Sequence, residues 1–226
     1  AAGMAPSTEC LQQALMGLLN LGISLKQMGR IDEAIAVYRS MEERYVAAIA
    51  GGLPWNALAL RQMLKADLNL GIVCKQTGRV EEAVEAYRAL PLRYLRTLAA
   101  GLPHDPGCLE TVLAGMFNLA VLHAQDTRDA EAAAVYEQMQ ELYQDAIADG
   151  LPHEGPILQH VLMGGFNLGV LRNRAGLPRD AIVGYESLRR LYRRAVEDGL
   201  RPTHGLMFQV LMASLNLGVL YDRDGR

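Results

Sequence analysis

Five asparagines spaced 49 residues apart are the side chains of this sequence with the clearest potential for chemistry. Each precedes a leucine, as in the stretches NLGISLKQMGRIDEAIAVY and NLGIVCKQTGRVEEAVEAY. The series is Asn20, Asn69, Asn118, Asn167 and Asn216. A carboxamide offers both hydrogen-bond donors and an acceptor, so it can pair with the N–H and C=O of a peptide unit whatever its side chain. A row of such amides is therefore able to bond either to a polypeptide backbone or to groups within the fold.

The positions seven residues before and after each asparagine are polar as well. Seven residues make almost two helical turns, so the three positions lie nearly on one face of a helix. The sets are Gln13-Asn20-Gln27, Gln62-Asn69-Gln76, Thr111-Asn118-Gln125, His160-Asn167-Arg174 and Gln209-Asn216-Arg223. Core packing alone does not favour such a stripe, because a buried amide without a partner costs about 1–3 kcal/mol.

Residues suited to metal binding or nucleophilic catalysis do not converge in the sequence. The best local cluster is PHDPGC, with His104, Asp105 and Cys108, and the next unit repeats its histidine as His153 but not its cysteine. The two close ligand pairs of structural metal sites are missing, so helix capping and loop solvation are the expected roles. His123 lies at a position that differs in every other unit, which indicates tolerance. We expect no catalytic residue, no metal and no cofactor.

Helices must position the asparagines, because apolar residues recur at spacings of three and four and breakers fall at two fixed places in each unit. The first break, Gly-Arg or its equivalent, is short enough to predict an antiparallel helix hairpin. The second, Gly-Leu-Pro, is a helix stop signal. First helices are predicted at 8–28, 55–77, 105–126, 155–174 and 203–224, and second helices at 30–50, 79–100, 128–149 and 177–198. Pro91 lies inside one of them and predicts a kink or a local irregularity.

Small and aromatic residues recur at fixed offsets in each unit. They are Leu21-Gly22, Gly29, Glu33-Ala34 and Tyr38 in the first unit, and Leu70-Gly71, Gly78, Glu82-Ala83 and Tyr87 in the second. These offsets resemble the signature of the tetratricopeptide repeat (TPR) family. The period exceeds the family's usual 34 residues by 15, close to four helical turns, so about two turns are added to each helix.

The resemblance implies an all-α, right-handed superhelical solenoid of about nine helices in antiparallel pairs. We expect a single repeat domain over residues 1–226, with units starting near 6, 55, 104, 153 and 202 and the last unit incomplete. The glycine at position 22 and its equivalents predict a close approach of the first helix to the second, with Ala34 as the matching flat surface. Such an approach offsets the roughly 1 kcal/mol that a helical glycine costs relative to alanine.

In the resembling family the first helices line the concave face, and an asparagine at this position projects into it, in some members as a ladder along a bound extended peptide. The resemblance thus implies a protein–protein interaction scaffold with the five asparagines as its peptide-binding residues. Packed helices lie about 8–10 Å apart and an extended chain advances roughly 3.3 Å per residue, so each asparagine would meet about every third peptide residue. Neighbours on the same face, which include Val121 and Val170, would supply specificity. The further predicted contacts are Gln27, Gln76, Gln125, Lys26, Lys75 and Arg174, whose cationic members favour acidic segments.

Three alternatives stay open at this point. The amides could bond within the fold and merely fix the register of the repeats. The repeats could be a targeting or regulatory arm of a larger enzyme. They could also be a self-assembly module, since the fifth unit ends after its first helix and its apolar flank would be uncapped.

Composition narrows the partners further. A formal charge of −3 and a pI near 6.0 lack the basic excess of nucleic-acid binding, so we expect no nucleic-acid partner. The three cysteines form no disulfide framework, which favours a reducing intracellular compartment. We find no run of about 18 uninterrupted apolar residues and expect no membrane insertion.

Overall fold

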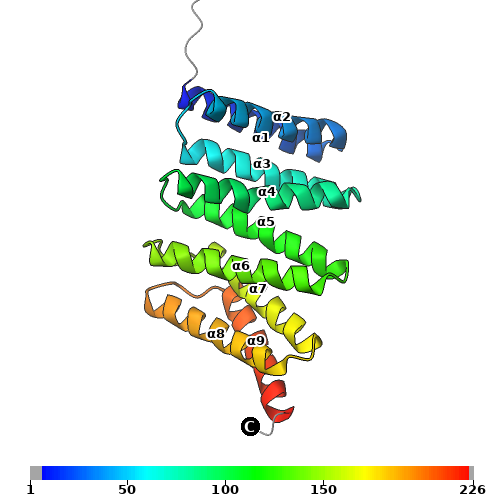
Figure 1. Ribbon diagram of the computed structural model, residues 1–226, viewed down its shortest axis with the longest axis vertical. Helices are drawn as coiled ribbons and strands as arrows, with labels where there is room; N and C mark the ends of the chain where they lie inside the picture. Colours follow the sequence, from blue (N-terminus) through cyan, green and yellow to red (C-terminus); the bar gives the residue numbers. More distant parts are fainter. Residues whose placement is uncertain (1–6, 224–226) are drawn as a thin grey trace, which may run out of the picture. The chain divides into compact units, whose positions relative to one another are not determined.

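The computed structural model describes residues 7–223, and over that range it is an all-α helical repeat solenoid (Figure 1). The first helices of the repeats are α1 (Thr8–Gln27), α3 (Ala57–Gln76), α5 (Pro106–Gln125), α7 (Gly155–Arg174) and α9 (His204–Arg223). The second helices are α2 (Ile31–Ala50), α4 (Val80–Ala99), α6 (Asp129–Ala148) and α8 (Pro178–Glu197). Every one of these helices has 20 residues, so the extra length of the repeat is shared equally.

Within residues 7–223 the predicted helices are confirmed, and no end is more than two residues from its predicted place. The predicted end at 224 lies outside the described residues. The hairpin turn begins with a left-handed residue, Gly29 at φ 75°, after which the N–H of Arg30 donates to the carbonyl of Leu25 at 2.9 Å. This bond satisfies a carbonyl that the helix end would leave unpaired. In the third hairpin Thr127 takes the same conformation at φ 59°, which a β-branched residue adopts only under strain. The second helix of the second repeat, α4, is continuous through Pro91.

The predicted close approach of the two helices in a hairpin is confirmed, but its partner is a tyrosine ring. A Cβ built on Gly22 would lie 2.4 Å from the ring of Tyr38, and one on Gly71 would lie 2.3 Å from the ring of Tyr87. A side chain at either position would force the tyrosine ring to move, so this packing favours glycine. Ala34 is fully buried but does not make this contact with Gly22.

The chain divides into two compact units at Gly115 and Met116, within α5. The first unit contains α1 to α4 and the start of α5, and the second contains the remainder of α5 and α6 to α9. In each unit the core lies between first and second helices and is built largely from leucines, alanines and tyrosines. The single domain over 1–226 stays a prediction, and its two ends and the predicted start of the first unit near residue 6 lie outside the described residues.

Arg93 connects three helices of the first unit. Its Nε donates to the Oδ2 of Asp67 on α3 at 2.8 Å, and its guanidinium also pairs with Glu42 on α2. Asp67 is only 2% exposed. Burial raises the pKa of Asp67 to about 7, against the opposing attraction of Arg93.

Two helices of the described chain are long and apolar enough to cross a membrane by length and composition alone, α5 and α9. In the most apolar 18-residue window of α5, 61% of the residues are buried, as in the core helices of soluble proteins that pass the same test. The corresponding share in α9 is 22%. The large apolar side chains that α9 exposes are Met207, Phe208, Leu211, Leu215 and Val219. This helix therefore displays an apolar face with no helix of the described chain packed on it.

Candidate functional site

In the first unit the predicted stripe lies on partly exposed helix surface. Asn20 is exposed on α1, while Asn69 on α3 is half-buried and donates from Nδ2 to the backbone carbonyl of Lys65 at 2.8 Å. Gln27 and Gln76 are exposed, and Lys26 and Lys75 are half-buried. This bond lies within α3, so it uses one N–H of the Asn69 amide but does not connect two helices.

In the second unit the structure brings three predicted residues together around one cavity of about 260 Å³. Gln125 at the end of α5 and Asn167 and Arg174 on α7 all line it. The remaining lining residues are Val121, Ala124, Tyr136, Val170 and Leu171. The cavity thus combines amide and guanidinium groups with apolar walls, as ligand sites commonly do.

A tyrosine hydroxyl from the second helix holds the asparagine at this cavity. Asn167 donates from Nδ2 to the hydroxyl oxygen of Tyr136 at 2.9 Å, and Asn216 makes the equivalent bond to Tyr185 at 3.0 Å. Burial raises the pKa of Tyr136, so the phenol stays neutral and the bond persists over the whole physiological range. Asn118 is half-buried on α5.

The amide of Asn167 keeps capacity for a ligand beyond its bond to Tyr136. A carboxamide has two N–H donors and two acceptor positions on its oxygen, and the Tyr136 bond uses one donor. Arg174 is 63% exposed, and its closest carboxylate contact is at 3.4 Å, to Asp129. Such an exposed pair contributes little to stability, so the guanidinium can exchange Asp129 for another anion.

The tyrosines that bond to the asparagines are site residues that the sequence did not predict. Tyr136 and Tyr185, the equivalents of Tyr38, are buried core residues whose hydroxyl oxygens also accept hydrogen bonds from asparagines. The signal was available in the sequence, because both pairs are separated by 31 residues. A second missed pairing joins each repeated histidine to a tyrosine: Tyr94 with His104 at 2.9 Å and Tyr143 with His153 at 2.5 Å.

The PHDPGC cluster caps a helix, as expected. The carboxylate of Asp105 accepts from the backbone N–H of Cys108 at 2.8 Å and from Arg61 at 2.8 and 2.9 Å. Although burial opposes the effect, these donors hold the pKa of Asp105 below its usual value. Burial raises the pKa of the Cys108 thiol, which suppresses the reactive thiolate. Within residues 7–223, no group of three or more His, Cys, Asp or Glu side chains is placed to hold a metal ion.

Comparison with known proteins identifies the type of repeat. Residues 17–46 match the tetratricopeptide repeat family model. The fold is similar to that of a putative kinesin light chain from Podosopora anserina with nearly identical TPR-like repeats, with a TM-score of 0.51 and 21% identity over 95% of this chain and 88% of that one. Residues 17–46 are therefore a TPR repeat, and the described chain has a TPR-type fold. A point variant of the same Podosopora protein is similar to this TPR-type chain with a TM-score of 0.52.

The TPR-type chain is also similar in fold to BtubC (BKLC) from P. vanneervenii, with a TM-score of 0.57 and 20% identity over 96% of this chain and 75% of that one. No curated protein matches the sequence. TPR-type folds are generally scaffolds that bind other proteins and generally carry no catalytic chemistry of their own.

Proposed function

We propose that this TPR-type chain binds an extended segment of another protein along its first helices, and that Asn167 is the central contact in the second unit. The observation that carries the proposal is the cavity shared by Gln125, Asn167 and Arg174, in which three polar groups on the predicted stripe face one space. We propose no catalytic role for the chain.

The cavity suits a peptide in three respects. The carbonyl oxygen and second N–H of Asn167 match the N–H and C=O of one peptide unit. Val121 and Val170 form apolar walls for a side chain of that peptide, and Arg174 favours an acidic neighbour. Contacts of this kind recognise the peptide backbone at the asparagine and the peptide side chains around it.

The same role is proposed in the first unit for Asn20 and Asn69. There Gln27 and Gln76 extend the polar face and Lys26 and Lys75 add positive charge. In the second unit Asn118 and Asn216 complete the stripe. Each residue is proposed here as a contact to backbone or acidic groups of the bound segment.

The bond to Tyr136 also supports a register role for Asn167, and two variants separate the roles. Asn167→Ala removes the whole amide, whereas Tyr136→Phe removes the bond but leaves the amide at the cavity. Peptides selected on the wild-type chain from a displayed library are then titrated against both variants, after circular dichroism has shown equal helicity. Loss of binding in Asn167→Ala with retention in Tyr136→Phe supports the proposal.

Equal binding by the wild type and Asn167→Ala contradicts the proposal. Equal loss of binding in both variants, together with equal loss of stability, assigns the amide to repeat register alone.

Self-association is a second proposed function, favoured by the exposed face of α9. Gly22 lies against Tyr38 in the first hairpin, and Gly169 lies against Tyr185 in the fourth. The equivalent residue of α9 is Gly218, where a Cβ would meet nothing within 4 Å. Together with the exposed apolar side chains of α9, this leaves a surface shaped to accept a packed helix, which we propose comes from a second copy.

A further inference from the structure

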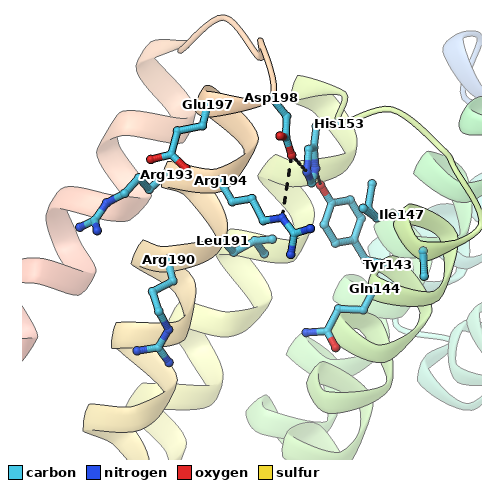
Figure 2. Close-up of a pocket in the computed structure, with 11 residues that line it drawn as sticks. Tyr143, Gln144, Ile147, His153, Arg190, Leu191, Arg193, Arg194, Glu197 and Asp198 are labelled. Carbon is cyan, nitrogen blue, oxygen red and sulfur yellow. Dashed lines mark hydrogen bonds and ion pairs between the residues drawn. The ribbon is translucent and has the colours of Figure 1, made fainter.

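A cleft in the second unit has an arginine wall that the asparagine stripe does not explain. It lies between α6 and α8 and has a volume of about 850 Å³ (Figure 2). From α6 and the following loop it is lined by Tyr143, Gln144, Ile147, Ala148 and His153. From α8 and its C-terminal end it is lined by Arg190, Leu191, Arg193, Arg194, Glu197 and Asp198.

The floor of the cleft is held in place by a tyrosine and a histidine. Tyr143 bonds to Nδ1 of His153 at 2.5 Å, and Nε2 of His153 lies 3.3 Å from Oδ2 of Asp198. Burial raises the pKa of Tyr143, so its hydroxyl stays neutral where it contacts Nδ1 of His153. The His153 side chain is 6% exposed and therefore has a fixed orientation.

The arginines of the opposite wall are only loosely paired. Arg190 lies 3.6 Å from Glu186 and donates to Ser187 at 2.8 Å, whereas Arg194 lies 4.0 Å from Asp198. Their side chains are 61% and 76% exposed. Neither makes a two-bond contact with a carboxylate, so both guanidinium groups have donors available for an incoming anion. Figure 2 shows Arg194 extending toward His153 and Tyr143, while Arg193 points away from α6.

The α6 wall that faces the arginines adds no charged side chain to the cleft. The cleft residues of α6 are all uncharged, and Gln144 offers an amide. The acidic residues of α6 do not line the cleft; they are Asp129, Glu131, Glu137, Glu141 and Asp145. The arginines therefore face a wall of α6 that contains one amide, Gln144, and the apolar side chains of Ile147 and Ala148.

The repeat itself does not require arginine at these two positions. The residues equivalent to Arg190 and Arg194 at the 49-residue period are Glu43 and Ala47 in α2, Leu92 and Arg96 in α4, and Glu141 and Asp145 in α6. The same hairpin is built with acidic, apolar or basic residues there. The scaffold thus leaves the two arginines free to serve recognition.

We propose that this cleft binds an acidic segment of a partner protein. A carboxylate of the segment lies between Arg190 and Arg194, which are one helical turn apart on the same face of α8. A peptide unit bonds to Gln144, and an apolar side chain packs on Ile147 and Leu191. Because Glu197 and Asp198 balance part of the positive charge, the cleft suits single carboxylates better than a phosphate dianion, and the carboxylates of α6 disfavour nucleic acid.

The test uses the full chain and a fluorescein-labelled peptide of alternating Glu and Leu, followed by fluorescence anisotropy at low ionic strength. Its control peptide has every Glu replaced by Gln. The test variant is Arg190→Glu/Arg194→Glu. The matched control is Arg189→Glu/Arg201→Glu, which makes the same charge change at exposed positions of the same unit outside the cleft.

The proposal expects the Glu peptide to bind the wild type and the matched control equally, and the test variant at least about tenfold more weakly. Binding weakens with added salt, the Gln peptide does not bind, and Asn167→Ala binds as the wild type does because it belongs to a different cavity. Equal loss in both double variants overturns the proposal in favour of diffuse electrostatic attraction. Absence of wild-type binding up to about 1 mM peptide, equal binding of the Gln peptide, or stronger binding of a phosphoserine peptide also overturns it.

Discussion

The side-chain amide of Asn167 donates a 2.9 Å hydrogen bond to the hydroxyl of Tyr136, which lies one helix earlier in the chain. Asn216 and Tyr185 repeat the relationship at 3.0 Å. The bond connects successive repeats through a residue that also lines a cavity. A polar group can therefore fix repeat register and still present the remainder of its amide to a ligand.

Removing the Tyr136 hydroxyl should lower the free energy of unfolding by about 1 kcal/mol, because Asn167 then loses its partner. Tyr38 provides the control: its buried hydroxyl has no hydrogen-bond partner within the described chain. Tyr38→Phe is therefore expected to leave stability unchanged or raised. Urea unfolding of Tyr136→Phe and Tyr38→Phe measures the difference, and equal effects of the two variants would contradict this assignment.

A methyl group at Gly71 should destabilise the first unit. The added Cβ would lie 2.3 Å from the Tyr87 ring, a clash that costs about 1–3 kcal/mol and outweighs the helix-propensity gain of alanine. Gly17 on α1 is the matched control, because a Cβ there meets nothing within 4 Å. Gly17→Ala should therefore stabilise by up to about 1 kcal/mol. Thermal unfolding of both variants checks the prediction, and a stabilised Gly71→Ala would disprove the close packing.

The buried carboxyl of Asp67 should give the chain a characteristic pH dependence. Its pKa is raised from 3.8 to about 7 on folding, so between these values the folded state retains a proton that the unfolded state has lost. The contribution of Asp67 to the free energy of unfolding is then fully present below about pH 4, falls as the pH rises, and is constant above about pH 7.

Asp67→Asn removes this titration. We therefore expect the stability of the wild type relative to the variant to fall from pH 4 to pH 7, as measured by denaturant unfolding at several pH values. Asp105 contributes with the opposite sign, because its pKa is lowered on folding and its stabilisation is lost in acid. A wild-type to variant difference that does not change with pH would show that Arg93 keeps Asp67 ionised.

The exposed face of α9 should drive association that depends on concentration. Light scattering of the wild type is expected to show a rising mass with concentration, and Leu211→Glu/Leu215→Glu should remain monomeric, because its charges resist burial. The control Leu92→Glu/Leu95→Glu places the same charges at exposed leucines of α4. A constant monomer mass for the wild type would refute self-association through α9.

The helices and hairpins were predictable because their signals are local. The left-handed turn at Gly29 and the apolar spacing of α1 each depend on residues within a few positions of one another. The close approach at Gly22 followed from a glycine recurring inside a helix, but the sequence did not show that Tyr38 fills the space. That assignment depends on how two helices are rotated against each other, which periodicity does not determine.

The candidate site was predictable only as a stripe of residues. The sequence showed that Gln125 lies on the polar face of one first helix and that Asn167 and Arg174 lie on the equivalent face of the next. The cavity that joins them requires the packing of α5, α6 and α7. The arginine cleft was missed for a different reason. Most other repeats have no arginine at the positions equivalent to Arg190 and Arg194, so the 49-residue period does not single these two residues out.

The contact between a glycine and a tyrosine ring lies within one hairpin, as at Gly22 and Tyr38. Both members of the contact are therefore inherited together whenever a 49-residue segment is duplicated. A lineage can lengthen or shorten such an array by whole segments without having to evolve a new fit inside each copy. Repeats added or removed by protein engineering should therefore be joined at the Gly-Leu-Pro linkers between hairpins, because this choice leaves the contact between glycine and tyrosine inside each hairpin intact.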